Sequence, residues 1–186
     1  ESLQKSFTVT RGRPEGKDVT QALLAVYEIL LRNQTDVSAQ AQLRYNMAET
    51  HAAVDDLPRA VQQYRGVTEL AGQLSLRDRA LVPKAAFQAM AIRYEQLTRK
   101  QMFPKELKPV APFAVQEAVI PTMVTEWISW VDEAPRVGAH LDSSYATFRF
   151  EAARLLYHSG RVRPAVDRLR GWLASEPAGK YAVPAA

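Results

Sequence analysis

Two segments of the chain, Tyr45–Tyr64 and Phe150–Leu169, align with each other without a gap. Alanine occupies the same two positions in both copies, which are Ala48 and Ala60 in the first and Ala153 and Ala165 in the second. The repeat therefore predicts two helical hairpins of the same design, one toward each end of the chain.

The composition favours helix throughout the chain. Only 8 of 186 residues are glycine, and good helix formers are abundant. Apolar side chains recur at spacings of three and four residues, which is the pattern of a helix with one buried face. The predicted helices span 18–33, 37–54, 58–70, 78–100, 113–131, 142–158 and 164–174. We therefore expect an all-α fold of about seven helices with no obligatory strand.

Acidic residues and prolines mark the helix starts. Asp18 is expected to cap the first helix, and Asp55 and Asp56 are expected to cap the third. Pro58 suits the first turn of the third helix, where its missing N–H is not needed. Pro121 is expected to kink the helix over 113–131.

Two stretches lack helical periodicity. Residues 1–17 are predicted to form an extended arm or linker, in which 6–10 is a candidate strand. Residues 100–112 contain three prolines, so we predict a proline-rich loop insertion near the middle of the chain. The chain opens with Glu1, and we expect it to be an internal fragment or a processed chain.

The aligned segments resemble the tetratricopeptide repeat (TPR), a helix–turn–helix unit of about 34 residues. In this family a small residue on the first helix meets an alanine on the second, where the two backbones approach closely, so the resemblance implies that Ala48 packs against Ala60 and Ala153 against Ala165. The clearest copies cover 41–74 and 146–177. The second copy is the better match, because it also has the turn glycine Gly160, Trp172 and the closing Pro177. The first copy has Asp55 at the turn and Gly72 at the closing position, and both copies have arginine where the family has its first-helix tryptophan.

The resemblance implies a TPR-like α-solenoid of antiparallel helical hairpins. We predict a single helical domain over 18–177, followed over 178–186 by a tail or the start of a further repeat. The separation of the two copies is close to three repeat lengths, so the middle helices are expected to form one or two altered repeats. Repeat stacks need neighbours to cover their ends, so self-association through exposed ends is a further expectation.

The chain has no pattern that predicts catalysis. There are no cysteines, no phosphate-binding glycine loop and no nucleophile elbow, and the three histidines lack metal-ligand spacing. His51 lies four residues before Asp55, but the TPR pattern makes it a packed histidine. Trp127, Trp130 and Trp172 are expected in the core. We therefore predict no enzyme activity, no cofactor and no metal.

Basic residues are concentrated near the C-terminal end. The segment 149–170 holds six arginines against Glu151 and Asp167, which gives it the same formal charge, +4, as the whole chain. Without interleaved exposed aromatic residues this pattern does not favour nucleic acid. A solvated helix face or an acidic protein partner fits it better. No run of about 20 apolar residues is present, so membrane insertion is not expected.

In TPR proteins the first helix of each repeat lines the concave surface, and this geometry is carried over to both copies. The resemblance implies a protein- or peptide-binding face for which we predict seven residues. They are Tyr45 and Glu49 in the first copy and Phe150, Arg154, Tyr157, His158 and Arg161 in the second. Arginine and flat aromatic side chains suit an acidic segment of a partner protein. The lysines and asparagines of the family's chaperone-tail clamp are absent.

We therefore predict a non-catalytic scaffold for protein–protein interaction. The last repeat looks like those of bacterial cell-envelope TPR proteins, which implies a periplasmic or outer-membrane-associated assembly. A cytosolic TPR adaptor or regulator that binds a signalling partner is the alternative. An enzyme or a nucleic-acid binder is the remaining class.

Overall fold

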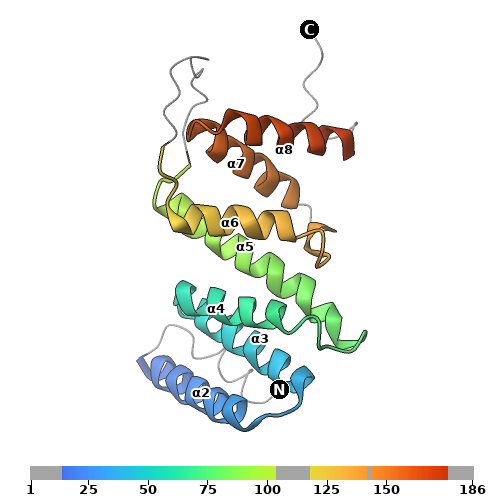
Figure 1. The fold of residues 1–186 in the computed structure, drawn as a ribbon. Coiled ribbons are helices and arrows are strands. Elements are labelled where there is room, and N and C mark those ends of the chain that lie inside the picture. The colour runs from blue at the N-terminus through green and yellow to red at the C-terminus, as the bar shows by residue number, and fades with distance from the viewer. Residues whose placement is uncertain (1–13, 104–117, 142–143, 176–186) are drawn as a thin grey trace. The chain divides into compact units, whose positions relative to one another are not determined.

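The computed structural model describes residues 14–103, 118–141 and 144–175, which are drawn as coloured ribbon in Figure 1. Within these ranges the chain is helical and has no strand. The elements are α2 (Pro14–Asn33), α3 (Val37–Ala53), α4 (Leu57–Glu69), η1 (Asp78–Ala80), α5 (Leu81–Arg99), α6 (Thr122–Glu133), η2 (Ala139–Leu141), α7 (Tyr145–His158) and α8 (Val162–Ser175). The prediction of an all-α fold with about seven helices is confirmed.

The packing divides the chain into two compact units, and the division falls between Ala89 and Met90, inside α5. The first unit contains α2, α3, α4 and the beginning of α5. The second contains the end of α5 together with α6, α7 and α8. The single domain expected over 18–177 stays a prediction.

The first unit is organised around the antiparallel hairpin of α3 and α4 (Figure 1). Ala48 and Ala60, the predicted close-packing pair, are both 0% exposed. Asp56 caps α4, since its carboxylate accepts a hydrogen bond from the backbone N–H of Arg59. Asp55 does not cap and instead forms the turn with a positive φ of 61°. The predicted cap is therefore confirmed for Asp56 only.

The predicted extended arm ends earlier than expected. Helix α2 begins at Pro14, so residues 14–17 are helical and Asp18 lies inside the helix, where it is not a cap. The physical reason is the one given for Pro58: proline fits the first turn of a helix, where no hydrogen-bonded N–H is required. The rest of the arm, including the candidate strand over 6–10, lies outside the described residues.

In the second unit, Pro121 starts α6 and does not kink it. It occupies the N-cap position, and the helix runs from Thr122 to Glu133. A proline inside a helix would remove a backbone hydrogen bond, whereas at the cap it removes none. The predicted helix over 113–131 is therefore too long at its N-terminal side: residues 118–121 are not helical, and 113–117 lie outside the described residues.

Side chains of α6 contact the second half of α5. The indole N–H of Trp127 donates a 3.0 Å hydrogen bond to the Met90 carbonyl oxygen on α5. Trp127 is 0% exposed. It belongs to an aromatic cluster with Tyr94, Phe103 and Phe148, whose ring centroids lie 4.8 to 5.9 Å apart. Much of the predicted proline-rich insertion lies outside the described residues.

The second hairpin, α7 with α8, repeats the design of the first. Ala153 and Ala165 are both buried. Gly160 turns the chain with a φ of 78°, a conformation that favours glycine. Helix α8 begins at Val162, two residues before the predicted start at Pro164, so Pro164 lies in its first turn, while Pro177 lies outside the described residues.

The predictions for tryptophan and histidine packing hold with one correction. Trp127 and Trp172 are buried as expected. Trp130 is only half-buried, and the guanidinium of Arg93 lies 5.1 Å from its ring centroid. His51 is buried, and its Nδ1 lies 3.3 Å from the carboxylate of Asp56.

We expect Ala60→Leu to destabilise the chain by about 1–3 kcal/mol, because the added atoms must fit into a closed contact between α3 and α4. Urea unfolding followed by circular dichroism measures the change. Ala80→Leu, at an exposed position in η1, is the matched control and should leave the midpoint almost unchanged. Equal midpoints for Ala60→Leu and the parent chain would contradict close packing at this pair.

The stability of the first unit should fall on acidification through the ordinary pKa of histidine. Burial lowers the pKa of His51, an effect that Asp56 opposes only partly. The folded chain therefore takes up this proton less readily than the unfolded chain, and the stability present above pH about 6.5 is lost below it. We expect His51→Gln to lose less stability than the parent chain between pH 7.5 and 5.0. Urea midpoints at several pH values measure this, and parallel curves for the two proteins would rule it out.

Candidate functional site

Helix α7 is the central element of the second unit, because α6, α8 and η2 all pack against it. Its apolar side chains are spaced at helical intervals and buried, and they include Phe148, Ala152 and Leu155. Its remaining side chains are polar or aromatic and lie at the edge of this core. The predicted binding residues of the second copy are all on α7 or in the turn that follows it.

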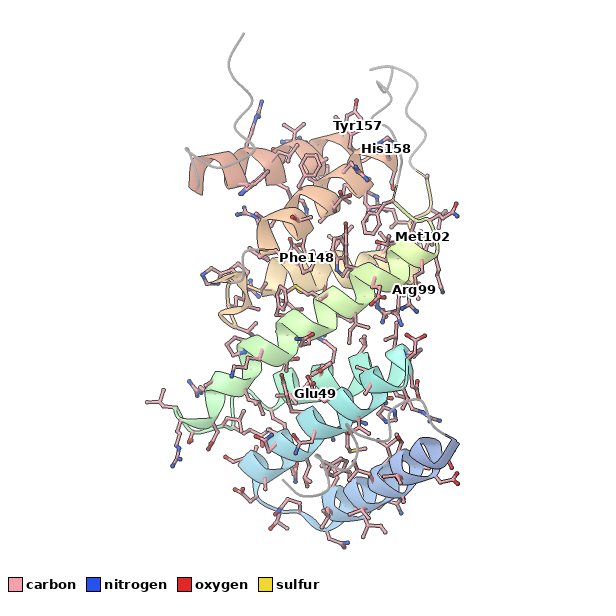
Figure 2. The ribbon with its side chains drawn as sticks, turned by 180° about the vertical axis from the view of Figure 1, so that it is seen from behind. Glu49, Arg99, Met102, Phe148, Tyr157 and His158 are labelled. Carbon is pink, nitrogen blue, oxygen red and sulfur yellow. The ribbon has the colours of Figure 1, made fainter. Side chains whose placement is uncertain are left out.

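These predicted residues are half-buried, and none is fully exposed. They are Phe150, Arg154, Tyr157, His158 and Arg161. The rings of Tyr157 and His158, labelled in Figure 2, contact each other edge to face with centroids 5.8 Å apart. The structure thus gathers the five residues along one helix and its C-terminal turn.

The two predicted residues of the first copy, Tyr45 and Glu49, lie together in the first unit. The hydroxyl of Tyr64 donates a hydrogen bond to the Glu49 carboxylate, and the Tyr45 and Tyr64 rings meet edge to face at 5.4 Å. Burial and the neighbouring Glu49 raise the pKa of Tyr45. The predicted binding residues therefore form two groups, one in each unit.

Arg154 is engaged inside the protein. Its Nη2 lies 3.1 Å from the Glu151 carboxylate, which the sequence analysis counted only as a charge. Glu151 is just 9% exposed, and burial raises the pKa of its carboxyl while Arg154 partly offsets this. Burial of the His158 side chain and the positive charge of Arg154 both lower the pKa of His158. Arg154 thus balances a buried carboxylate in the isolated chain.

A groove on the second unit was not predicted from the sequence. It has a volume of about 560 Å³ and lies where the C-terminal part of α6, η2, the start of α7 and α8 meet. Its lining includes the apolar side chains of Val131, Leu169 and Trp172. It also includes five polar or aromatic residues, namely Asp132, His140, Tyr145, Arg149 and Arg168. We call this the α6–α8 groove.

Two arginines and one carboxylate, Arg149, Arg168 and Asp132, line the α6–α8 groove. Arg168 on α8 forms a two-point ion pair with Asp132 on α6, so these charges cancel. The guanidinium of Arg149 lies 5.9 Å from the Tyr145 ring centroid. The Tyr145 hydroxyl donates a 2.9 Å hydrogen bond to the Val131 carbonyl oxygen, and burial raises the pKa of Tyr145. The groove therefore combines a cation with fixed apolar walls.

A second hollow of about 310 Å³ adjoins the groove and shares Asp132 and Arg168 with it. Its apolar lining comes from α6, α7 and α8, and Arg161 also lines it. The Asp132–Arg168 ion pair thus lies at the boundary between the groove and this second hollow. Arg161 is the one predicted residue that belongs to this surface.

Sequence reasoning missed the groove because its residues come from three separate segments. Asp132, His140 and Tyr145 lie outside the basic segment 149–170, and Trp172 was predicted to lie in the core. The available signal was the local excess of arginine over 149–170, which holds Arg149 and Arg168. Only packing shows that an acidic residue of α6 neutralises one of them.

The described residues carry no group of His, Asp and Glu side chains that could hold a metal ion. In the same part of the chain, no helix is long and apolar enough to cross a membrane.

Comparison with known proteins does not assign this chain to a family. No protein-family model matches the chain, and no curated protein matches it. A solved structure from Podosopora anserina, described as a kinesin light chain with nearly identical TPR-like repeats, aligns over 96% of both chains at 13% identity. The TM-score of this alignment is 0.36, which is too low to establish a common fold.

We expect Arg154→Met to lower the free energy of unfolding by about 1–3 kcal/mol, because it leaves the buried Glu151 carboxylate without its counterion. Adding Glu151→Gln should recover part of this loss. Urea unfolding of the single and double variants measures the coupling, with exposed Arg163→Met as the control. Strictly additive losses would show that the two side chains do not depend on each other.

Proposed function

We propose that this chain is a non-catalytic protein-binding module that holds an acidic segment of a partner protein in the α6–α8 groove. The observation that carries the proposal is that two guanidinium groups, those of Arg149 and Arg168, line one groove beside the apolar side chains of Leu169 and Trp172. A carboxylate on a peptide binds arginine through charge-assisted hydrogen bonds, and an adjacent apolar side chain gains from burial.

The volumes of the groove and the adjoining hollow suit a short segment of an extended or helical peptide as the ligand. The two adjoining hollows of about 560 and 310 Å³ fall within or near the range of about 300–1,000 Å³ that is usual for ligand pockets. A second carboxylate of the ligand would meet Arg168, where it competes with Asp132 for the same guanidinium. Such competition makes affinity depend on the number and spacing of the ligand's acidic residues.

The residues predicted from the sequence enter this proposal in two ways. Arg161 lines the second hollow and extends the binding surface toward the C-terminal end of α7. Phe150, Tyr157 and His158 remain proposed contacts on α7 itself. Tyr45 and Glu49 in the first unit are a separate proposed contact surface.

The wider setting is proposed from the TPR resemblance. A place in a bacterial envelope assembly, in the periplasm or at the outer membrane, is the first proposal, and a cytosolic adaptor is the second. A signal peptide or lipid-attachment motif in the full-length gene would favour the first. Cell fractionation with an antibody against the chain distinguishes the two directly.

Binding is tested with a fluorescent peptide of alternating Glu and Leu and its counterpart with Gln in place of Glu. We expect the Glu peptide to bind and the Gln peptide not to bind. Arg149→Glu should weaken binding at least about tenfold, since it replaces an attractive charge with a repulsive one. Fluorescence anisotropy measures both affinities.

The matched control is Arg170→Glu, which makes the same charge change at an exposed position of α8 that does not line the groove. Equal losses for Arg149→Glu and Arg170→Glu would indicate nonspecific attraction and overturn the proposed site. Loss only in Arg154→Glu/Tyr157→Ala/Arg161→Glu would move the site to the C-terminal end of α7.

A further inference from the structure

Helix α2 has two apolar sides, and only one of them packs against α3. The inner side contains Thr20, which is buried, followed by Leu24, Tyr27 and Leu31 at helical spacing, which are half-buried. Helix α3 lies alongside α2 in Figure 1. This inner side accounts for the position of α2 in the first unit.

The outer side of α2 exposes an unusual amount of apolar surface. Val19, Val26, Ile29 and Leu30 are 36 to 57% exposed. Of the seven large apolar side chains that are exposed in the described part of the protein, these four are on this one helix. Single exposed apolar residues are common, whereas a cluster on one helix face indicates an interaction surface.

The spacing of this cluster is that of a coiled-coil seam. Val19, Ala22, Val26 and Ile29 alternate three and four residues apart, which places them at the a and d positions of successive heptads. A helix of 20 residues is about 30 Å long, so it accommodates two heptads. The partner that fits such a seam is another helix.

The charges that flank the seam identify the partner helix as a second α2. Asp18 and Arg32 lie two heptads apart at the same edge of the seam, and both are exposed. When two α2 helices pack antiparallel, Asp18 of each copy lies opposite Arg32 of the other, so two ion pairs form. A parallel pair would place Asp18 beside the uncharged Leu23 and would place Arg32 beyond the C-terminal end of the partner's α2, which is Asn33.

We propose that this chain forms a symmetric dimer in which the outer sides of two α2 helices pack antiparallel. The interface is self-complementary, as a two-fold axis requires, because each residue of the seam meets the seam of the other copy. Within one copy, Arg32 pairs with Glu28 at 3.6 Å. This is an exposed surface ion pair of small energetic value, so it does not prevent Arg32 from pairing with Asp18 of the other copy. This dimer is independent of peptide binding in the α6–α8 groove.

The test is sedimentation equilibrium of the 186-residue chain over a range of protein concentrations. We expect a concentration-dependent monomer–dimer equilibrium. Val26→Lys should abolish the dimer, because it places a charge in the centre of the seam. Leu76→Lys, at a position that is 86% exposed and outside α2, should not change it. Circular dichroism and urea unfolding check that both variants remain folded.

Exchange of the flanking charges tests the antiparallel arrangement. Asp18→Arg and Arg32→Asp should each weaken the dimer, and the double variant D18R/R32D should restore it. A chain that stays monomeric at all concentrations, or a dimer that Val26→Lys does not affect, would overturn the proposal. Failure of the double variant to restore the dimer would overturn the antiparallel arrangement.

Discussion

The close approach of two helices at an alanine pair is the contact on which both units depend. Helix α3 packs against α4 and α7 against α8, and the alanines of the two predicted pairs, Ala48 with Ala60 and Ala153 with Ala165, are all buried. Because each pair brings two backbones close together, the larger side chains on either side of it must interdigitate. In the first unit this places Tyr64 against Tyr45 and Glu49, and in the second it places α8 beside the groove.

Ion pairs between and within helices then decide where charge remains at the surface. In the described part of the second unit they include Glu151–Arg154 within α7, Asp132–Arg168 between α6 and α8, Glu126–Arg93 between α6 and α5, and Glu95–Arg99 within α5. A formal charge of +4 over 149–170 suggests a uniformly basic face. Pairing of Arg154 and Arg168 with carboxylates makes the charge of this face uneven.

The helices were predictable because their signals are local. Asp56, Pro58 and Gly160 act within one turn of chain, and each has the predicted role in the structure. The two errors at helix starts concern prolines, since Pro14 was assigned to an arm and Pro121 to the inside of a helix. A proline interrupts the regular hydrogen bonding of a helix, but the local sequence does not show whether the helix lies before or after the proline.

By itself, the sequence determined the fold class, the positions of most helices and the alanine pairs that join them. These properties follow from periodicity, capping and side-chain size, which act between residues close in the chain. Only the tertiary structure decided that Glu151 is buried beside Arg154, that Asp132 neutralises Arg168, and that α2 keeps an uncovered apolar side. Burial and charge pairing of this kind depend on which helices meet, and residues far apart in the sequence determine that.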